Sequence, residues 1–219
     1  MIIFSLKPEN VLVGKDGYAK LTDFGLAKEN VAGSSDAKSL CGTAEYLSPE
    51  ILMRQGHGKS SDWWSFGAII YEMLCGLPPF YSKDREKLYK NIKYADPRLD
   101  FPFLSDSARD LLTKLLEKDP SKRLGSGERD AQDIKEHPWF DCINWDAISE
   151  KKIPPPYKPQ LDVPTDTKHF TQEFTGMKLS PTDVESLKDG SALEGGLGWN
   201  GFSYVNADVG GGNMEMDIQ

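Results

Sequence analysis

The feature that most constrains the fold of this chain is a segment, residues 62–76, that is apolar on nearly every side. Its sequence is DWWSFGAIIYEMLCG. A helix with apolar residues all round must be covered by other elements, so we expect this helix to be central and buried. Asp62 is expected to cap its start, and Gly76 with the prolines that follow it should end it. The rest of the fold must therefore be organised around this helix.

Further helices are predicted after the central one. Residues 82–94 form an exposed, charged helix, and residues 131–137, followed by Pro138-Trp139-Phe140, complete the helical region. Between them, Ser105 caps a helix whose apolar residues recur at the i, i+3, i+4, i+7 spacing of a core-facing stripe. These residues are Ala108, Leu111, Leu112, Leu115 and Leu116.

Length and composition restrict the classes of protein. With 219 residues, of which 38% are hydrophobic, the chain can form one sizeable core and a tail. The net charge of −8 belongs mainly to the tail, because the chain from Leu161 onward holds ten acidic residues and three lysines. No basic stripe favours nucleic-acid binding, and no apolar run is long enough to cross a membrane. The three cysteines are widely spaced and odd in number, which favours reduced thiols over disulfides. This predicts a cytoplasmic location, with the nucleus as a further one.

The residues with the most distinctive chemistry lie between Leu6 and Gly25. Two short strands, 11–13 and 18–21, are predicted around an Asp-Gly pair that is typical of a tight hairpin. The hairpin fixes the separation of Asn10 before it and Asp23 after it. Mg²⁺ prefers oxygen ligands and usually takes only one or two from protein, so an amide and a carboxylate suffice. Together with Lys7, they could hold a metal-bound phosphate.

This stretch resembles the catalytic loop and metal-binding segment of protein kinases, whose pattern is His-Arg-Asp-Leu-x-x-x-Asn followed by Asp-Phe-Gly. The resemblance implies that Asn10 and Asp23 bind Mg²⁺ with ATP, and that Lys7 neutralises the transferring phosphoryl group. Ser5 occupies the position of the catalytic aspartate. Because a serine hydroxyl cannot accept a proton near neutral pH, and losing a general base costs roughly 10²- to 10⁴-fold in rate, Ser5 is not expected to act.

Residues 39–50 resemble the activation segment of the AGC group, the relatives of protein kinases A, G and C. On this resemblance, Ser39 is a phosphorylation site, although an ordinary solvated serine is an equal alternative. Thr43 stands where the family's threonine contacts the loop lysine, here Lys7. A phosphate on Ser39 would add about −1.5 to −2 charge and could order the segment by pairing with arginine.

Other roles also follow from the resemblance. Asp62 would anchor the backbone of the catalytic loop. Glu9 and Glu72 would bind arginines upstream of the phosphoacceptor through bidentate contacts; the alternative for Glu72 is a helix-face charge. Arg123 would pair with Glu50, which closes the activation segment. If buried, this pair would cost about 3–5 kcal/mol to break, whereas the alternative is a surface arginine.

The C-terminal part matches the AGC tail. Residues 145–159 are too rich in proline for regular structure and should lie extended. Ser180 resembles the turn-motif phosphorylation site. Residues 199–204, with Ser203, resemble the hydrophobic motif, and residues 205–219 are expected to be disordered. Together these motifs resemble the branch of protein kinase B, serum kinases and ribosomal-protein kinases.

The resemblance implies an α+β protein-kinase-like fold: a mainly α-helical C-lobe with a small β-hairpin, then an extended tail. The expected divisions are a partial C-lobe at 1–140, the tail at 141–204 and the disordered end at 205–219. Because the family pattern begins at Leu6, we expect the N-lobe to be absent from this chain and the chain alone to be inactive.

Two functions remain open. The first is a serine/threonine protein kinase that uses ATP and Mg²⁺ and acts on protein substrates with upstream basic residues. It would be a monomer, activated by an upstream kinase. The second is a non-catalytic, pseudokinase-like C-lobe that serves as a binding or scaffold fragment. The retained Asn10, Asp23, Glu9 and Glu72 fit both functions, because either protein would inherit them.

Overall fold

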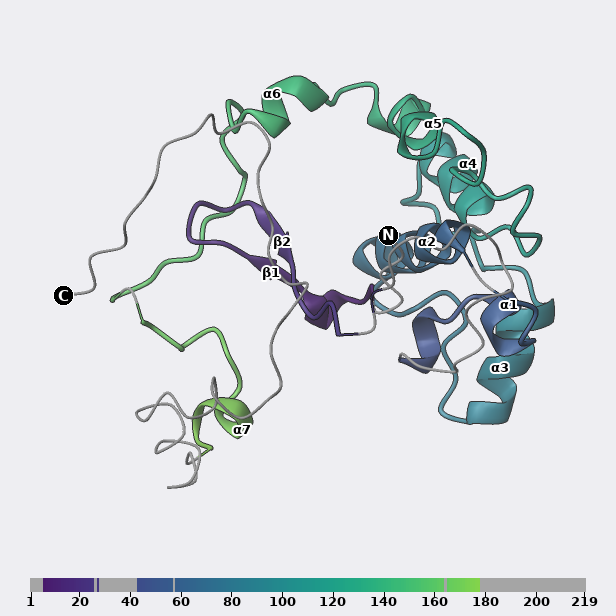
Figure 1. The fold of residues 1–219 in the computed structure, drawn as a ribbon, viewed down its shortest axis with the longest axis horizontal. Helices are drawn as coiled ribbons and strands as arrows, with labels where there is room; N and C mark the ends of the chain where they lie inside the picture. The colour runs from purple at the N-terminus through teal and green to yellow at the C-terminus, as the bar shows by residue number, and fades with distance from the viewer. Residues whose placement is uncertain (1–5, 26, 28–42, 57, 164, 178–219) are drawn as a thin grey trace, which may run out of the picture. The chain divides into compact units, whose positions relative to one another are not determined.

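The computed structural model describes residues 6–25, 27, 43–56, 58–163 and 165–177 (Figure 1). The chain divides into two compact units, 1–161 and 162–219. The described part of the first unit contains, in chain order, η1 (Pro8–Asn10), β1 (Val11–Val13), β2 (Ala19–Leu21), η2 (Ala44–Tyr46), α1 (Pro49–Leu52), α2 (Lys59–Cys75), α3 (Arg85–Tyr94), α4 (Asp106–Leu115), α5 (Ala131–Lys135), η3 (Pro138–Phe140) and α6 (Trp145–Ser149). The second unit contains α7 (Gln172–Thr175).

The two strands form the predicted antiparallel hairpin. Val11 pairs with Leu21 and Val13 with Ala19. The loop closes through two backbone hydrogen bonds, from the Gly14 amide to the Tyr18 carbonyl at 2.9 Å and from the Gly17 amide to the Gly14 carbonyl at 2.8 Å. The strands lie largely at the surface, so contacts outside the hairpin must help to hold its geometry, since an isolated two-stranded hairpin is marginally stable in water.

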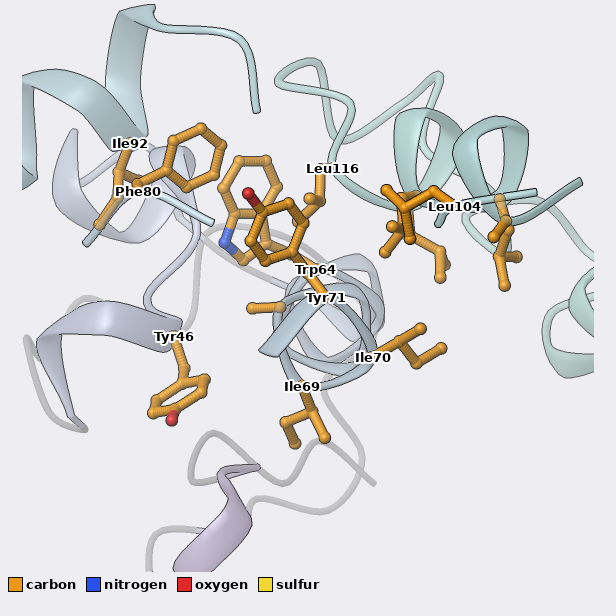
Figure 2. Close-up of a cluster of buried hydrophobic side chains, with 14 of the residues drawn as sticks. Tyr46, Trp64, Ile69, Ile70, Tyr71, Phe80, Ile92, Leu104 and Leu116 are labelled. Carbon is orange, nitrogen blue, oxygen red and sulfur yellow. The ribbon is translucent and has the colours of Figure 1, made fainter. Parts of the chain in front are cut away.

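Helix α2 is buried as the sequence predicts. Trp64 and Ala68 are fully buried, and Ile70 and Tyr71 nearly so. Figure 2 shows Trp64, Ile69, Ile70 and Tyr71 pointing away from the helix axis in different directions toward surrounding elements. The predicted cap was wrong, however. The helix begins one turn earlier, after Gly58, and Asp62 lies in its first turn, where a carboxylate still interacts favourably with the helix dipole.

Helix α4 packs directly on α2. Ser105 accepts a hydrogen bond from the Ala108 amide at 3.1 Å, which confirms the predicted cap. The predicted apolar stripe is also confirmed, because Leu111, Leu112 and Leu115 are fully buried. A Cβ atom on Gly67 of α2 would lie 2.8 Å from the Leu115 Cβ. Only glycine therefore permits the two helices to approach this closely.

The remaining core is built around an aromatic stack. The rings of Trp64 and Phe80 lie parallel, with centroids 5.5 Å apart. Helix α3 contributes Leu88 and Ile92, both buried. Its first turn is capped by Asp84, which accepts hydrogen bonds from the amides of Glu86 and Lys87. Helix α3 therefore begins at Arg85, three residues later than the predicted start at residue 82. The Asp84 carboxylate accepts hydrogen bonds from first-turn amides that have no partner within the helix.

The prediction that residues 145–159 lack regular structure was wrong at their start. Residues 145–149 form α6, with Asn144 accepting a hydrogen bond from the Ala147 amide at 3.0 Å. The prolines begin only at Pro154, so they leave this turn intact. The indole of Trp145 donates to the Lys135 carbonyl at 3.1 Å and its ring packs against Phe140 at 5.3 Å. From residue 152 to 161 the backbone forms neither helix nor strand.

Helices with one small antiparallel sheet make up the described fold, which agrees with the coarse prediction of an α+β protein. Of the helices in the described ranges, none has the length and apolar character needed to span a membrane. The elements that matter for the chemistry are the hairpin, η2 and the start of α1, and the central helix α2.

Candidate active site

The hairpin brings Asn10 and Asp23 together. Asn10 ends η1 immediately before β1, and Asp23 follows β2 by two residues. The Asn10 side-chain amide lies 3.5 Å from the Asp23 carboxylate. The main chain is fixed at the same point, because both the amide and the hydroxyl of Thr22 donate to the Asn10 carbonyl, at 2.9 and 3.3 Å. The hairpin register therefore sets the separation of these two side chains.

The backbone of Asp23 adopts an uncommon conformation. Its φ of 60° lies in the left-handed region, which few residues other than glycine adopt, although aspartate is enriched there. One carboxylate oxygen accepts a hydrogen bond from the Gly25 amide at 3.4 Å, while the other faces Asn10. Such backbone conformations cluster at functional sites.

Asn10 and Asp23 fit a divalent cation such as Mg²⁺. Both side chains carry oxygen donors, and Mg²⁺ is commonly held by one or two protein oxygens with water and phosphate completing its shell. Asn10 is buried, and Asp23 lies exposed beside it. The charge and donor type of the pair therefore match the ion that the sequence analysis assigned to it.

Lys7 and Thr43 line the same small pocket. The Lys7 ammonium donates to the Thr43 hydroxyl at 3.2 Å. Asp62, in the first turn of α2, lines the same pocket, as do Tyr46 and Ser65. Residues from three separate segments, 6–7, 43–51 and 61–65, thus meet at one place, as expected if α2 supports the loop that carries Lys7.

Glu72 projects from α2 toward η2. The Tyr46 hydroxyl donates to its carboxylate at 2.5 Å, and the Tyr46 carbonyl accepts a hydrogen bond from Ser65 at 2.9 Å. Burial, followed by the bond to Glu72, raises the pKa of Tyr46 far above its usual value, and the charges of Glu9 and Glu45 add to the effect. The negative charges of these glutamates therefore converge on one tyrosine.

Tyr46 was not singled out in the sequence analysis. Its role depends on a contact with Glu72, 26 positions away, which no local pattern reveals. The available signal was its place next to Glu45 in a segment that carries several predicted functional residues. A tyrosine there, between predicted functional residues, is more informative than an isolated surface tyrosine.

Glu50 and Arg123 form a buried ion pair. The two guanidinium NH groups lie 2.7 and 2.9 Å from the two Glu50 carboxylate oxygens. Arg123 also donates to the carbonyls of Ser60 at 2.7 Å and Glu117 at 2.9 Å, while Ser61 donates to Glu50 at 2.7 Å. Burial alone would raise the pKa of Glu50, but Arg123 outweighs it and the pKa lies below its usual value.

The ion pair ties the segment after η2 to the loop that follows α4. The alternative of a surface arginine is excluded by geometry, because the Arg123 side chain is fully buried. Its guanidinium also lies over the Trp64 ring, 5.1 Å from the centroid.

Four predicted site residues lie outside the described residues: Ser5, Ser39, Ser180 and Ser203.

The sequence matches one family of known proteins over most of the helical region. The protein kinase domain family matches residues 2–140. The chain is 45% identical over 206 residues to the serine/threonine-protein kinase Sgk1 of Homo sapiens, covering 91% of this chain and 47% of that protein. It is 46% identical over 186 residues to the RAC serine/threonine-protein kinase of Drosophila melanogaster, covering 84% of this chain and 30% of that protein.

A third relative shows similar identity and coverage. The RAC-beta serine/threonine-protein kinase B of Xenopus laevis is 43% identical over 190 residues, covering 86% of this chain and 39% of that protein. The chain therefore spans less than half of the length of each of these relatives.

Proposed function

Because this chain belongs to the protein kinase family, we propose that it forms the C-lobe and tail of an AGC-group serine/threonine kinase. Its reaction is the transfer of the γ-phosphate of ATP to serine or threonine of a protein. The observation that carries the proposal is the meeting of Asn10 and Asp23, 3.5 Å apart, at the open end of the hairpin. Separately, Lys7 contacts Thr43.

Each residue has a separate task in this reaction. Asn10 and Asp23 hold a divalent cation through side-chain oxygens, and that cation, when bound, supplies positive charge to the nucleotide phosphates. Lys7 contributes a second positive charge, and its bond to Thr43 orients the ammonium. Because phosphoryl transfer depends almost wholly on positioning and electrostatic stabilisation, these fixed side chains constitute this chain's main contribution.

Glu9 and Glu72 select the substrate. The Tyr46 hydroxyl holds one Glu72 oxygen and leaves the other available to a guanidinium. An arginine of the substrate can then make charge-assisted hydrogen bonds, which are about twice as strong as neutral ones. In the chimera with human Sgk1 that is described below, Glu72→Gln is expected to raise the KM for a peptide with arginine upstream of serine, with little change for a peptide in which alanine replaces that arginine.

A chimera tests the proposal. Residues 6–219 are joined to the portion of human Sgk1 that precedes the matched region, with either serine or aspartate at position 5, and phosphate transfer to the arginine peptide is measured. With aspartate the chimera should transfer phosphate, and with serine the rate should fall roughly 10²- to 10⁴-fold. Asp23→Asn in the aspartate chimera should abolish transfer, whereas Asp100→Asn, an exposed acidic residue, is the control.

A non-catalytic binding module is the second candidate. It is favoured by one observation: Ser5 stands where the family pattern has its catalytic aspartate, whereas Glu9 and Glu72, the proposed substrate-binding residues, are retained. A folded chimera that binds the arginine peptide but transfers no phosphate with either residue at position 5 would refute the kinase proposal in favour of this one. Proteins with basic residues are binding partners under both candidates, whereas an activating upstream kinase is a partner under the first candidate only.

A further inference from the structure

The segment after α6 is fastened to the loop of the hairpin. The Lys151 ammonium lies 2.6 Å from the Asp16 carboxylate and 5.2 Å from the centre of the Tyr18 ring. The Tyr18 hydroxyl donates to the Ile153 carbonyl at 2.5 Å. Figure 1 shows this segment running beside the loop that joins β1 and β2. An ion pair, a hydrogen bond and a cation–π contact therefore join parts of the chain that are about 135 positions apart.

The backbones also meet closely at Gly17. Its φ of 87° lies in the left-handed region, and a Cβ atom there would lie 2.5 Å from the Tyr157 carbonyl oxygen and 2.8 Å from the Pro155 Cβ. Any other residue would push the proline-rich segment away. The loop is thus shaped to receive residues 155–157 as well as to bind Lys151.

The charges support the same contact. The Asp16 carboxylate accepts a hydrogen bond from the Tyr18 amide at 3.2 Å, with its other oxygen on Lys151. Lys151, followed by the Tyr18 amide, lowers the pKa of Asp16, and Asp16 in turn raises the pKa of Lys151. Both groups are therefore charged throughout the neutral range.

We propose that residues 151–157 act as a clasp that positions Asn10 and Asp23 through the hairpin. Both strands lie largely at the surface, and a two-stranded hairpin alone is marginally stable. The clasp holds its loop end, and the pairing of Val11 with Leu21 transmits that register to the other end, where Thr22 binds the Asn10 carbonyl. The inference rests on the proposed roles of Asn10 and Asp23, and it makes Asp16, Tyr18 and Lys151 positioning residues.

Hydrogen exchange of the hairpin amides tests the clasp directly. In the 219-residue chain, Lys151→Ala is expected to accelerate exchange of the hairpin amides, including that of Thr22, at least about threefold, since it removes an ion pair and a cation–π contact. Lys151→Arg should restore slow exchange. Lys152→Ala is the matched control, because Lys152 pairs with Glu150 instead of the hairpin. Equal exchange in the Lys151→Ala and Lys152→Ala variants would overturn the clasp.

Binding of Mn²⁺, a probe for the proposed cation site, tests the positioning role. The affinity for Mn²⁺, measured from paramagnetic broadening of amide signals, should fall at least about threefold in Lys151→Ala and recover in Lys151→Arg, while the unfolding midpoint stays unchanged. Faster exchange with unchanged Mn²⁺ affinity would overturn the positioning role. If the unaltered chain does not bind Mn²⁺, the proposed roles of Asn10 and Asp23 fail, and the exchange experiment still decides the clasp by itself.

Discussion

Replacing Arg123 by methionine should destabilise the chain more than any surface charge substitution. The change removes two short bonds to Glu50 and three bonds to backbone carbonyls, those of Ser60, Glu117 and Lys118. It leaves the Glu50 carboxylate buried with the Ser61 hydroxyl as its remaining side-chain partner. Removing one member of a buried ion pair costs about 3–5 kcal/mol. Because a domain is stable by only about 5–15 kcal/mol, this is a large fraction of the total.

The loss of stability in Arg123→Met should also depend on pH, in a direction that the pKa of Glu50 determines. In the unaltered chain Arg123 holds the pKa of Glu50 below its usual value of 4.5, so the pair stabilises the fold at neutral pH and this contribution is lost as pH falls through the lowered pKa. In Arg123→Met, burial is opposed only by the remaining hydrogen bonds from Ser61 and the backbone, and since burial is the largest single influence we expect it to raise the pKa of Glu50 above its usual value. The folded state then binds the proton more tightly than the unfolded state, so the stability deficit should shrink between pH 7 and pH 5.

Urea unfolding at pH 7, 6 and 5 measures both effects. Trp64, whose ring lies 5.1 Å from the Arg123 guanidinium carbon, provides a fluorescence signal at the site. Arg129→Met is the control, because Arg129 forms exposed ion pairs with Asp133 and Glu136 and should change the midpoint little. A deficit below about 1 kcal/mol, or one that grows as the pH falls, would refute the reasoning.

Three further substitutions test other parts of the structure. Ser48→Ala should raise the free energy of unfolding by about 1–3 kcal/mol, because the Ser48 hydroxyl is buried and none of the described residues hydrogen-bonds to it; a lower urea midpoint would contradict this. Burial lowers the pKa of Lys118 to about 8, so the free energy of unfolding should rise between pH 8 and 10. In Lys118→Met this rise should be smaller, as urea unfolding of the two proteins at both pH values would show. Gly17→Ala should accelerate hydrogen exchange of the hairpin, whereas Gly58→Ala, with open space around its Cβ position, should not.

Local patterns predicted the elements whose signals lie within a few residues. The hairpin follows from its Asp-Gly turn, and α4 follows from Ser105 and an apolar stripe that the structure buries. The start of α2 was misplaced because Asp62 is a good capping residue, yet the helix begins after Gly58 without any side-chain cap. Helix α6 was missed because prolines nine or more residues further on were given weight over Asn144.

Contacts between more distant residues needed more than local patterns. The predicted hairpin already placed Asn10 near Asp23, and the family pattern suggested Glu50 with Arg123; the structure places both pairs together. The family pattern did not suggest Tyr46 with Glu72, nor Asp16 with Lys151. In each of these pairs the residues are ordinary surface types by sequence, and only the packing of α2 or of the tail segment brings them into contact.

The most direct test of the account is whether Asn10 and Asp23 form a cation site in this chain. Mn²⁺ is titrated into the 219-residue chain and into Asp23→Asn, with Asp100→Asn as a control, while amide signals are followed by NMR. The account predicts that signals of residues 10 and 23 broaden first in the unaltered chain and in the control, and that this broadening is lost in Asp23→Asn. Equal broadening in Asp23→Asn, or broadening that begins elsewhere, would contradict it.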